Sequence, residues 1–521
     1  MKSGYDPALA KALRPYWLYK AYVPGENKLL KTKDGLALHE RQKTESKLVD
    51  SLETAVRQAG LRDGMTISFH HHFREGDFVV NQVLAVLARM GFKNLRVAAS
   101  SLSDVHAPMI EHIRSGLVTR IETSGLRGKL ANSVSHGLMA QPVVFRSHGG
   151  RASAITAGDL HIDVAFLGAP SVDPFGNANG YSREETGKSA CGSLGYAKVD
   201  AQYADKVIII TDNVVGYPNT PFGIPQSQVD YIVEVDSIGD QQKIATGATR
   251  YSQNPHDLLI AQNAAEVIAA SGYFEDGFSF QAGTGGASLA VVRFLRDRML
   301  EKGIKASFAL GGITGQIVKM HEEGLIRKIL DVQSFDLEAV ESLKTNRFHQ
   351  QIDANYYANP YVTESAAVNE LDLVVLSALE IDVDFNVNVL TGSDGIIRGA
   401  IGGHPDCAAG AALSILVAPL IRGRIPTILD RVNTICTPGS TVDVLVTDQG
   451  VAVNPARPEI AARLKAAHLK VSTIEELKAR AEKVVGKPEP LPFGEKIVGI
   501  VTYRDGSVID IIREIKNDGE A

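Results

Sequence analysis

The chain has 521 residues, with 54 basic and 60 acidic side chains and a formal net charge of −6. One core rarely supports more than roughly 250–300 residues, so we expect more than one domain. No basic block or tail stands out, which argues against nucleic acid as a partner. No apolar run reaches the roughly 20 residues that span a bilayer, so no membrane contact is expected.

The cysteines and the N-terminus lead us to expect a cytoplasmic protein. Cys191, Cys407 and Cys436 lie far apart and form no C-x-x-C pair, which is typical of a reducing compartment. Residues 1–14 are mixed and charged, without the basic region and apolar core of an export signal.

Residues 1–45 carry the only tryptophan, Trp17, and we expect them to form an N-terminal arm with little core of its own. From Ser46 onward, helical and extended patterns alternate, which is typical of parallel βαβ units. The elements expected in this first part are a helix at 48–59, a strand at 65–69, a helix at 78–90 and a strand at 95–99.

The same order of elements returns in the second half of the chain. Two Asp-Gly turns, at Asp63 and Asp276, lie 213 residues apart, and residues 162–179 align with 371–388 without a gap at a spacing of 209. The elements expected there are a helix at 258–270, a strand at 278–281, a helix at 287–300 and a strand at 306–310.

This repeat predicts two tandem homologous open α/β domains, at 46–245 and 246–485, with a boundary near 239–254. Residues 486–521 are predicted to be a stiff linker and a C-terminal β-hairpin that covers a sheet edge or meets a partner subunit.

Four polar residues recur in both copies, where one copy alone needs to be catalytic. We therefore interpret them as a turn device rather than a catalytic set. They are Asp173, Asn177, Asp382 and Asn386.

A glycine-rich loop separates the strand at 278–281 from the following helix and contains Gly283, Gly285 and Gly286. Such a loop leaves backbone N–H groups unpaired at the helix start, where the helix dipole favours negative charge. It is either an anion or oxyanion site or a tight βα turn without a ligand, and the glycines alone do not decide between them.

Four ordered segments resemble the coenzyme A transferase family, and together they extend the resemblance over about 46–481. They are A-G-T-G-G (282–286), L-S-A-L-E-I-D (376–382), G-G-H-P-D with G-A (402–406 and 410–411), and V-T-D-Q-G-V-A (446–452). The resemblance implies two open α/β domains of coenzyme A transferase type, in which the glycine loop is an oxyanion loop.

Within that family the arm, the triple histidine and the hairpin resemble the transferase subunits of citrate lyases. One departure agrees with this narrower resemblance: the strand after the loop helix, at 307–315, has no carboxylate. The commoner transferases place a nucleophilic Glu there, and a covalent route needs that side chain.

The candidate catalytic residues are Gly283, Gly285, Gly286 and Glu380. Glu380 lies in a family segment, and three roles are open for it: it orients the pantetheine arm of the thioester, it acts as a general base, or it hydrogen-bonds a turn. The candidate substrate-binding residues are His70, His71, His72, Arg74, Gly402, Gly403 and His404. Side chains alternate along extended chain, so at most two of the three adjacent histidines face one cleft. Structural roles remain open for all four histidines, and no metal site is expected because no further ligand is evident.

The resemblance implies exchange of carboxylates on a thioester: an acetyl thioester and citrate give a citryl thioester and acetate. It also implies that no cofactor is bound covalently on this chain, since the thioester is carried by a coenzyme A-like phosphopantetheine group on an acyl carrier protein. The implied partners are that carrier protein (γ subunit), a carbon–carbon cleaving β subunit and further copies of this chain. The alternatives are a free-standing coenzyme A transferase for small carboxylates and a non-catalytic assembly subunit.

Overall fold

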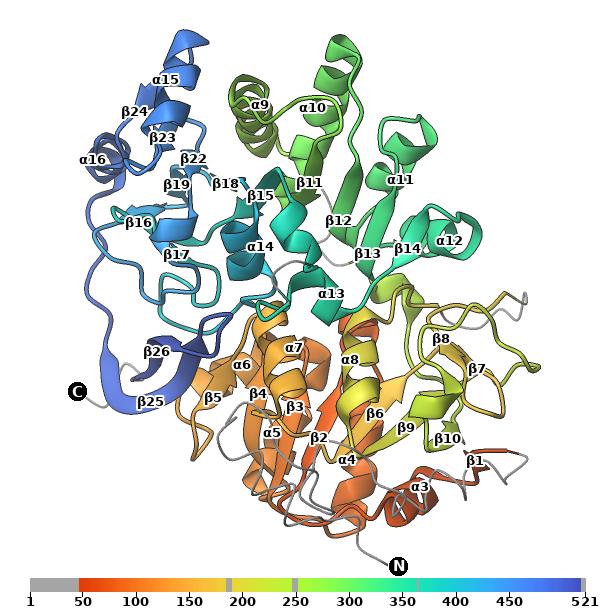
Figure 1. Ribbon diagram of the computed structural model, residues 1–521. Helices are drawn as coiled ribbons and strands as arrows, with labels where there is room; N and C mark the ends of the chain where they lie inside the picture. The colour runs from red at the N-terminus through yellow and green to blue at the C-terminus, as the bar shows by residue number, and fades with distance from the viewer. Residues whose placement is uncertain (1–45, 184–189, 246–251, 363–364, 517–521) are drawn as a thin grey trace, which may run out of the picture. The chain divides into compact units, whose positions relative to one another are not determined.

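Parallel strands rich in Val and Ile form two large sheets, one built mainly from the first half of the chain and one from the second (Figure 1). Because helices cover both faces of a parallel sheet, its strands are continuous apolar runs, as in β6 (Val164–Gly168) and β9 (Lys206–Thr211). The computed structural model describes residues 46–183, 190–245, 252–362 and 365–516. The arm expected at 1–45, with Trp17, lies outside the described residues.

The first sheet has ten strands. Neighbouring strands in it run parallel, except for the antiparallel pair β25 and β26 at one edge. In spatial order the strands are β1 (Leu48–Val49), β10 (Tyr231–Glu234), β9, β6, β2 (Thr66–Phe69), β3 (Leu95–Ala99), β4 (Val118–Thr123), β5 (Val143–Phe145), β25 (Phe493–Thr502) and β26 (Val508–Ile515). The helices of this half are α3 (Leu52–Ala59), α4 (Val79–Arg89), α5 (Met109–Arg114), α6 (Gly128–Ser135), α7 (His148–Ala157) and α8 (Gly195–Tyr203).

The second sheet has nine strands, with β22 and β23 as its antiparallel neighbours. In spatial order the strands are β14 (His349–Gln351), β13 (Ile329–Ser334), β12 (Phe308–Ile313), β11 (Ser279–Ala282), β15 (Leu373–Ser377), β18 (Leu413–Val417), β22 (Val444–Val446), β23 (Val451–Val453) and β24 (Val471–Ser472). The helices of this half are α9 (Pro255–Ala270), α10 (Gly286–Lys302), α11 (Gly315–Glu322), α12 (Leu337–Thr345), α13 (Ala354–Ala358), α14 (His404–Gly410), α15 (Pro458–Ala466) and α16 (Ile474–Val485).

Short elements complete the fold. The small sheets comprise β7 (Ser171–Val172), β8 (Ala178–Asn179), β16 (Glu380–Asp382), β17 (Val387–Asn388), β19 (Ile421–Arg422), β20 (Ile425–Pro426) and β21 (Ile428–Leu429). The 3-10 turns are η1 (Arg74–Gly76), η2 (Asp104–His106), η3 (Gln226–Gln228), η4 (Gln241–Lys243), η6 (Ala367–Glu370) and η7 (Gly439–Thr441). No helix in the described ranges is long and apolar enough to cross a membrane.

The expected helix at 48–59 is wrong at its start. Leu48 and Val49 pair in parallel with β10 as an edge strand, so the helix begins only at Leu52. Ser51 caps it by accepting a hydrogen bond from the Thr54 backbone N–H at 3.2 Å. The apolar period of the helix therefore begins after its cap, which a count of apolar residues alone does not reveal.

The two sheets repeat one topology, which confirms the tandem duplication. The order β10-β9-β6-β2-β3-β4-β5 matches β22-β18-β15-β11-β12-β13-β14 strand for strand. The aligned aspartates also do the same work: Asp163 accepts from the Thr66 N–H at 2.7 Å, and Asp372 accepts from the Ser279 N–H at 2.8 Å. The exact domain boundary remains a prediction, and residues 246–251 of the expected boundary region lie outside the described residues.

The recurring Asp and Asn residues form turns, as predicted. The Asp173 carboxylate accepts from the Asn177 N–H at 3.1 Å and the Asn177 amide at 2.8 Å. The Asp382 carboxylate accepts from the same two groups of Asn386, at 2.9 and 3.2 Å. These side chains therefore fix the loops after β7 and β16 in both halves.

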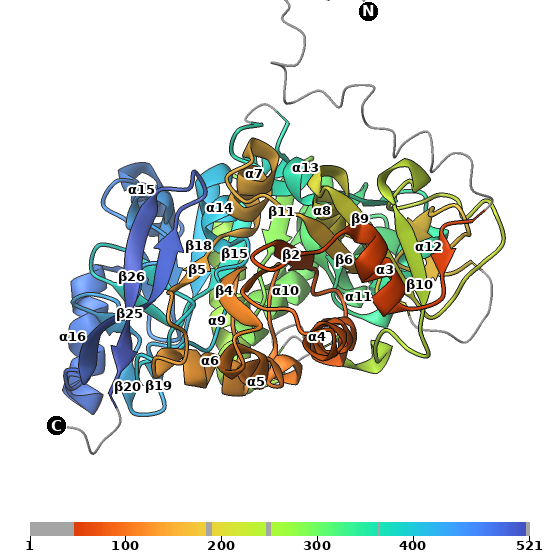
Figure 2. The same cartoon turned by 90° about the horizontal axis from the view of Figure 1, so that it is seen from below.

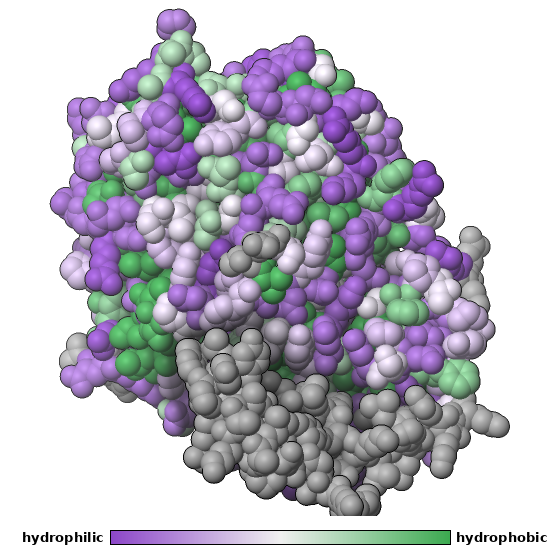
Figure 3. Space-filling model, in the orientation of Figure 1, coloured by the Kyte–Doolittle hydropathy of each residue, from purple (hydrophilic) through white to green (hydrophobic). Residues whose placement is uncertain are grey.

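The C-terminal hairpin extends the first sheet, because β25 pairs in parallel with β5 (Figure 2). The surface in Figure 3 is mostly hydrophilic, with an apolar area over this hairpin, where Phe493, Ile497 and Val508 are exposed. The hairpin therefore covers the β5 edge, and its contact with a partner subunit stays a prediction.

One hydrophobic core passes from the first half into the second. Alternate side chains of β15 enter different cores: Val374 and Leu376 join the core that also contains β2, β3 and β6, while Leu373 and Val375 join a second core on the other face. The two homologous halves are therefore not separate bodies, since the inner face of the second sheet is buried by the first half.

A crossover segment, which we define as residues 396–403, joins the halves through backbone hydrogen bonds. Gly399 O accepts from the Leu126 N–H at 3.1 Å, the Ile401 N–H donates to Ser124 O at 2.7 Å, and Gly402 O accepts from the His148 N–H at 2.8 Å. A Cβ on Gly125 would lie 2.2 Å from the Ala400 Cβ, so the close approach requires a glycine there.

Asp406, directly after the crossover segment, is buried at the same junction. Its carboxylate accepts from the Ser147 hydroxyl and the Gly149 N–H, each at 2.9 Å, and the Nε of Arg504 from the hairpin lies 3.7 Å away. Burial raises the pKa of the Asp406 carboxyl to about 6, although the Arg504 charge and the two hydrogen bonds lower it.

This pKa predicts a pH-dependent stability difference between the wild-type protein and Asp406→Asn. The folded protein binds the Asp406 proton more tightly than the unfolded chain does, because the pKa is higher in the folded state. This difference stabilises the fold fully at a pH below the unfolded pKa of 3.8, and the stabilisation is lost as the pH rises through about 6. We expect the wild-type free energy of unfolding, measured in urea relative to the variant, to fall by roughly 2 kcal/mol between pH 4 and pH 7. A difference that does not change with pH would contradict this assignment.

Candidate active site

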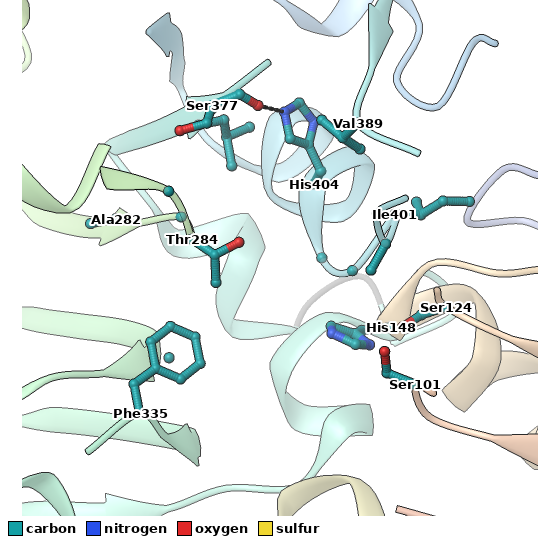
Figure 4. A pocket seen from close by; sticks show the side chains of 18 of the residues that line it. Ser101, Ser124, His148, Ala282, Thr284, Phe335, Ser377, Val389, Ile401 and His404 are labelled. Carbon is teal, nitrogen blue, oxygen red and sulfur yellow. Dashed lines mark hydrogen bonds between the residues drawn. The ribbon is translucent and has the colours of Figure 1, made fainter. Parts of the chain in front are cut away.

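A cavity of about 560 Å³ lies between the two halves, at the carboxyl ends of strands from both sheets. Ser101, Ser124 and His148 of the first half face Thr284, Ser377 and His404 of the second half across it (Figure 4). The carboxyl ends of parallel strands are where open α/β sheets bind their ligands.

The glycine loop lines this cavity from the second half. The Gly283 N–H donates to Val375 O at 2.7 Å, so it belongs to the β11–β15 ladder and is not available to a ligand. Gly285 has a φ of 123°, and α10 begins at Gly286. The N–H groups of Thr284, Gly285 and Gly286 have no acceptor within the described part of the chain. An unpaired helix start beside a cavity can accept an anion or oxyanion.

Two guanidinium groups reach the cavity from the first half. Arg74 lies 4.5 Å from the centre of the Phe335 ring, and burial together with the Arg127 charge lowers its pKa to about 9. Burial likewise lowers the pKa of Arg127, although the Glu75 charge raises it. Neither guanidinium forms an ion pair with any described residue, so the cavity holds two cations that lack a bonded counter-charge.

Neutral imidazoles lie beside these cations. The His148 ring lies tilted against the Tyr196 ring, with 4.3 Å between the ring centres, and burial and the Arg151 charge lower its pKa to about 3. Its Nδ1 is buried and has no hydrogen-bond partner among the residues described. His71 contacts Ser100 at 2.5 Å, and burial holds its pKa well below 6.5. Both rings therefore act as uncharged hydrogen-bonding groups at neutral pH.

The structure separates the three adjacent histidines. His71 and Arg74 line the cavity, whereas His70 and His72 do not. The rings of His70 and His72 contact each other through their Nδ1 atoms, and His70 Nε2 lies 2.9 Å from Gly168 O. One of the three histidines thus faces the cleft, within the limit set by the alternation of side chains.

Glu380 does not line the cavity. It is buried behind it, where its carboxylate accepts from the side-chain amides of Asn388 at 2.8 Å and Asn433 at 3.0 Å. Burial raises its pKa, although these hydrogen bonds lower it. Of its three open roles, this position favours stabilisation of the β16–β17 turn.

Gly402, Gly403 and His404 line the cavity, but both ring nitrogens of His404 are already engaged. Its Nδ1 lies 2.7 Å from the Thr437 hydroxyl, and its Nε2 lies 3.1 Å from Ser377 O. Burial lowers its pKa to about 4, so the ring is neutral. His404 therefore holds other groups in place instead of offering a free nitrogen to a ligand.

Several lining residues are missing from the sequence analysis: Arg127, His148, Tyr357, Arg398 and Arg422. Arg127 and His148 follow β4 and β5 within a few residues, so the rule that ligands bind at strand ends would have indicated them. Arg398 belongs to the crossover segment, and its place at the cavity depends on long-range pairing that no local pattern reveals.

The strand after the loop helix offers no nucleophile to the cavity. Gly312 of β12 lines it, and a Cβ at this position would lie 1.9 Å from the Phe335 ring. The carboxylates among the described lining residues are Glu75 and Asp257, from other elements. The Phe335 ring therefore fills the space that a side chain at position 312 would need.

Two homologous open α/β halves, with a glycine loop at their shared cavity, define the coenzyme A transferase fold class. The family model described as "Citrate lyase, alpha subunit (CitF)" matches residues 45–515. The chain belongs to this citrate lyase alpha subunit family.

Similar proteins cover nearly the whole chain. The citrate lyase alpha chain of Escherichia coli (strain K12) is 60% identical over 470 residues, which are 90% of this chain and 91% of that protein. The Klebsiella pneumoniae citrate lyase alpha chain is 58% identical over 478 residues, covering 92% and 93%.

Solved structures agree with this assignment. A crystal structure described as the putative alpha subunit of citrate lyase from Streptococcus mutans, in complex with citrate, is 56% identical, has a TM-score of 0.88 and covers 91% of this chain and 92% of its own. The malonate decarboxylase alpha subunit of Acinetobacter baumannii, at 16% identity and a TM-score of 0.62, covers 87% and 95% and shares the fold.

The loop geometry predicts that Gly285→Ala lowers stability. Its φ of 123° strains any side chain, and a Cβ would lie 2.3 Å from the Ser377 hydroxyl. We expect the free energy of unfolding in urea to fall by about 1–3 kcal/mol. Gly303→Ala at the other end of α10 is the control, because its φ is 66° but nothing lies within 4 Å of its Cβ. Equal losses in both variants would mean that the Ser377 contact does not restrict this position.

Proposed function

We propose that the chain transfers a thioester-bound carrier from acetyl to citrate, which yields a citryl thioester and acetate. The observation that carries the proposal is the pairing, in one cavity, of two guanidinium groups without a bonded carboxylate and a glycine loop with unpaired N–H groups. A trianionic substrate supplies the missing counter-charge, and the loop serves the oxyanions of acyl transfer.

The reaction proceeds in two balanced steps. A citrate carboxylate oxygen attacks the acetyl carbonyl, the C–S bond breaks, and a mixed anhydride and a free thiolate result. The thiolate then attacks the citryl carbonyl of the anhydride, the C–O bond breaks, and acetate leaves. Both steps pass through tetrahedral oxyanions and neither needs a proton, so preorganised N–H donors contribute most of the catalysis.

Arg74 and Arg127 bind the citrate carboxylates that do not react. Burial disfavours the charged form of each guanidinium, and the Arg127 charge further disfavours that of Arg74, so an anion between them relieves both effects. The uncharged His148 and the Ser101 hydroxyl lie on the same side of the cavity and offer hydrogen bonds to the remaining oxygens.

The thioester enters from the exposed side of the cavity, where Thr284, Arg398 and Arg422 are accessible. We infer that the natural carrier is a phosphopantetheine arm on an acyl carrier protein, and that no cofactor is bound covalently on this chain. The product then passes to a carbon–carbon cleaving β subunit of the same complex, in which this chain is present in several copies.

Direct attack by citrate follows from the missing nucleophile. Phe335 fills the space beside Gly312, and Glu380 is held by two asparagine amides away from the cavity. Without a carboxylate on β12, the substrate carboxylate is the group that attacks the thioester.

The test supplies the purified chain with citrate and acetyl-coenzyme A, or an acetylated carrier protein, and measures citryl thioester and acetate by chromatography and mass spectrometry. We expect turnover, with Arg127→Gln raising the KM for citrate roughly 10- to 100-fold because a hydrogen bond to a charged group is lost. The KM for the thioester should stay the same.

Arg327→Gln is the charge-matched control, since this exposed arginine pairs with Asp276 outside the cavity. Absence of turnover with either thioester would contradict the proposal and favour an assembly role. Equal changes in both KM values for Arg127→Gln would contradict the assignment of the citrate end.

A further inference from the structure

Ser288, in the first turn of α10, is tied to the glycine loop. Its hydroxyl lies 2.8 Å from Gly283 O and 3.0 Å from Gly285 O, so its single proton is shared between the two loop carbonyls, and Gly285 O also accepts from the Leu289 N–H of α10 at 3.0 Å. Ser288 is fully buried and does not line the cavity. It therefore holds the loop from the side that faces away from the substrate.

Fixing these carbonyls also fixes two N–H groups. A trans peptide is planar, and its N–H points opposite to its C=O. The peptide that contains Gly283 O carries the Thr284 N–H, and the peptide that contains Gly285 O carries the Gly286 N–H. With both carbonyls turned toward Ser288, both N–H groups are directed to the cavity side, and neither has an acceptor among the residues described.

A chain of hydrogen bonds holds Ser288 in turn. The Ser377 hydroxyl, at the end of β15, donates to the Ser288 hydroxyl at 3.0 Å. His404 Nε2 donates to Ser377 O at 3.1 Å (Figure 4), and His404 Nδ1 accepts from the Thr437 hydroxyl at 2.7 Å. Ser377 also lies directly against Gly285, where only a glycine fits.

We propose that Ser288, supported by Ser377 and His404, is a positioning residue that aims the Thr284 and Gly286 N–H groups at the oxyanion of acyl transfer. The proposal rests on the proposed function and assigns a role to His404 that does not need substrate contact. It also explains why Gly285 and a serine occur together: Gly285 admits Ser377, and Ser288 orients the 283–284 and 285–286 peptides.

The test is Ser288→Ala, with kcat, the KM for citrate and the dissociation constant of citrate measured separately. Loss of one oxyanion donor lowers kcat about 10²–10³-fold, so donors that remain but lose their alignment should lower it roughly 10- to 100-fold. The KM and the dissociation constant of citrate should change less than about twofold, because the guanidinium groups are untouched.

Ser414→Ala is the matched control. Ser414 is also buried in the second half and donates to a backbone carbonyl, Thr441 O, at 2.7 Å, but it lies outside the cavity. We expect it to lower the melting temperature as much as Ser288→Ala does and to leave kcat unchanged. A kcat for Ser288→Ala equal to that of Ser414→Ala would overturn the proposal.

The double variant Ser288→Ala/Ser377→Ala tests whether the two serines act as one unit. If they do, the kcat of the double variant should be no lower than that of the less active single variant, because removing the Ser288 hydroxyl already interrupts the series of hydrogen bonds. Losses that multiply would overturn the proposal. A wild-type enzyme without transferase activity would instead contradict the proposed function itself, so the two failures are distinguishable.

Discussion

The backbone pairing of the crossover segment with the first half is the constraint on which the site depends. Three hydrogen bonds hold residues 399–402 against the loop after β4 and the start of α7. The close approach is possible because Gly125 has no Cβ that would clash with Ala400. This contact sets the glycine loop of one half opposite the guanidinium groups of the other. Buried Asp406, which accepts from two groups of the first half, fixes the same junction.

Duplication explains how the two ends of the cavity acquired different chemistry. Both halves have the same strand order, yet the equivalent loops after β2 and β11 carry a histidine run in one and glycines in the other. The first half therefore supplies Arg74 and Arg127 to the cavity, and the second supplies the glycine loop together with Arg398 and Arg422. In the proposed reaction, citrate binding is thus assigned to one copy of the fold and oxyanion stabilisation to the other, and residues of both copies line the cavity.

The sequence predicted the repeated α/β architecture well, because strand periodicity, Asp-Gly turns and the aligned aspartates are all local signals. It also placed the glycine loop and His71 correctly at strand ends. It did not predict Arg398, since the approach of that residue to the cavity depends on how the halves pack, and it passed over Arg127 and His148, although both follow strand ends. Glu380 lies in a strong family segment, but its burial and its two asparagine partners come from β17 and the loop after β21, which sequence spacing does not reveal.

In the proposed reaction citrate attacks the thioester directly, and the fate of a citrate carboxylate oxygen tests this step. A single turnover would be run with carboxylate-¹⁸O-labelled citrate and unlabelled acetyl-coenzyme A, with enzyme in excess over the thioester, and the released acetate analysed by mass spectrometry. Direct attack predicts acetate that carries one ¹⁸O from citrate. Unlabelled acetate in that first turnover would mean that an enzyme carboxylate supplied the oxygen, and it would rule out direct attack by citrate.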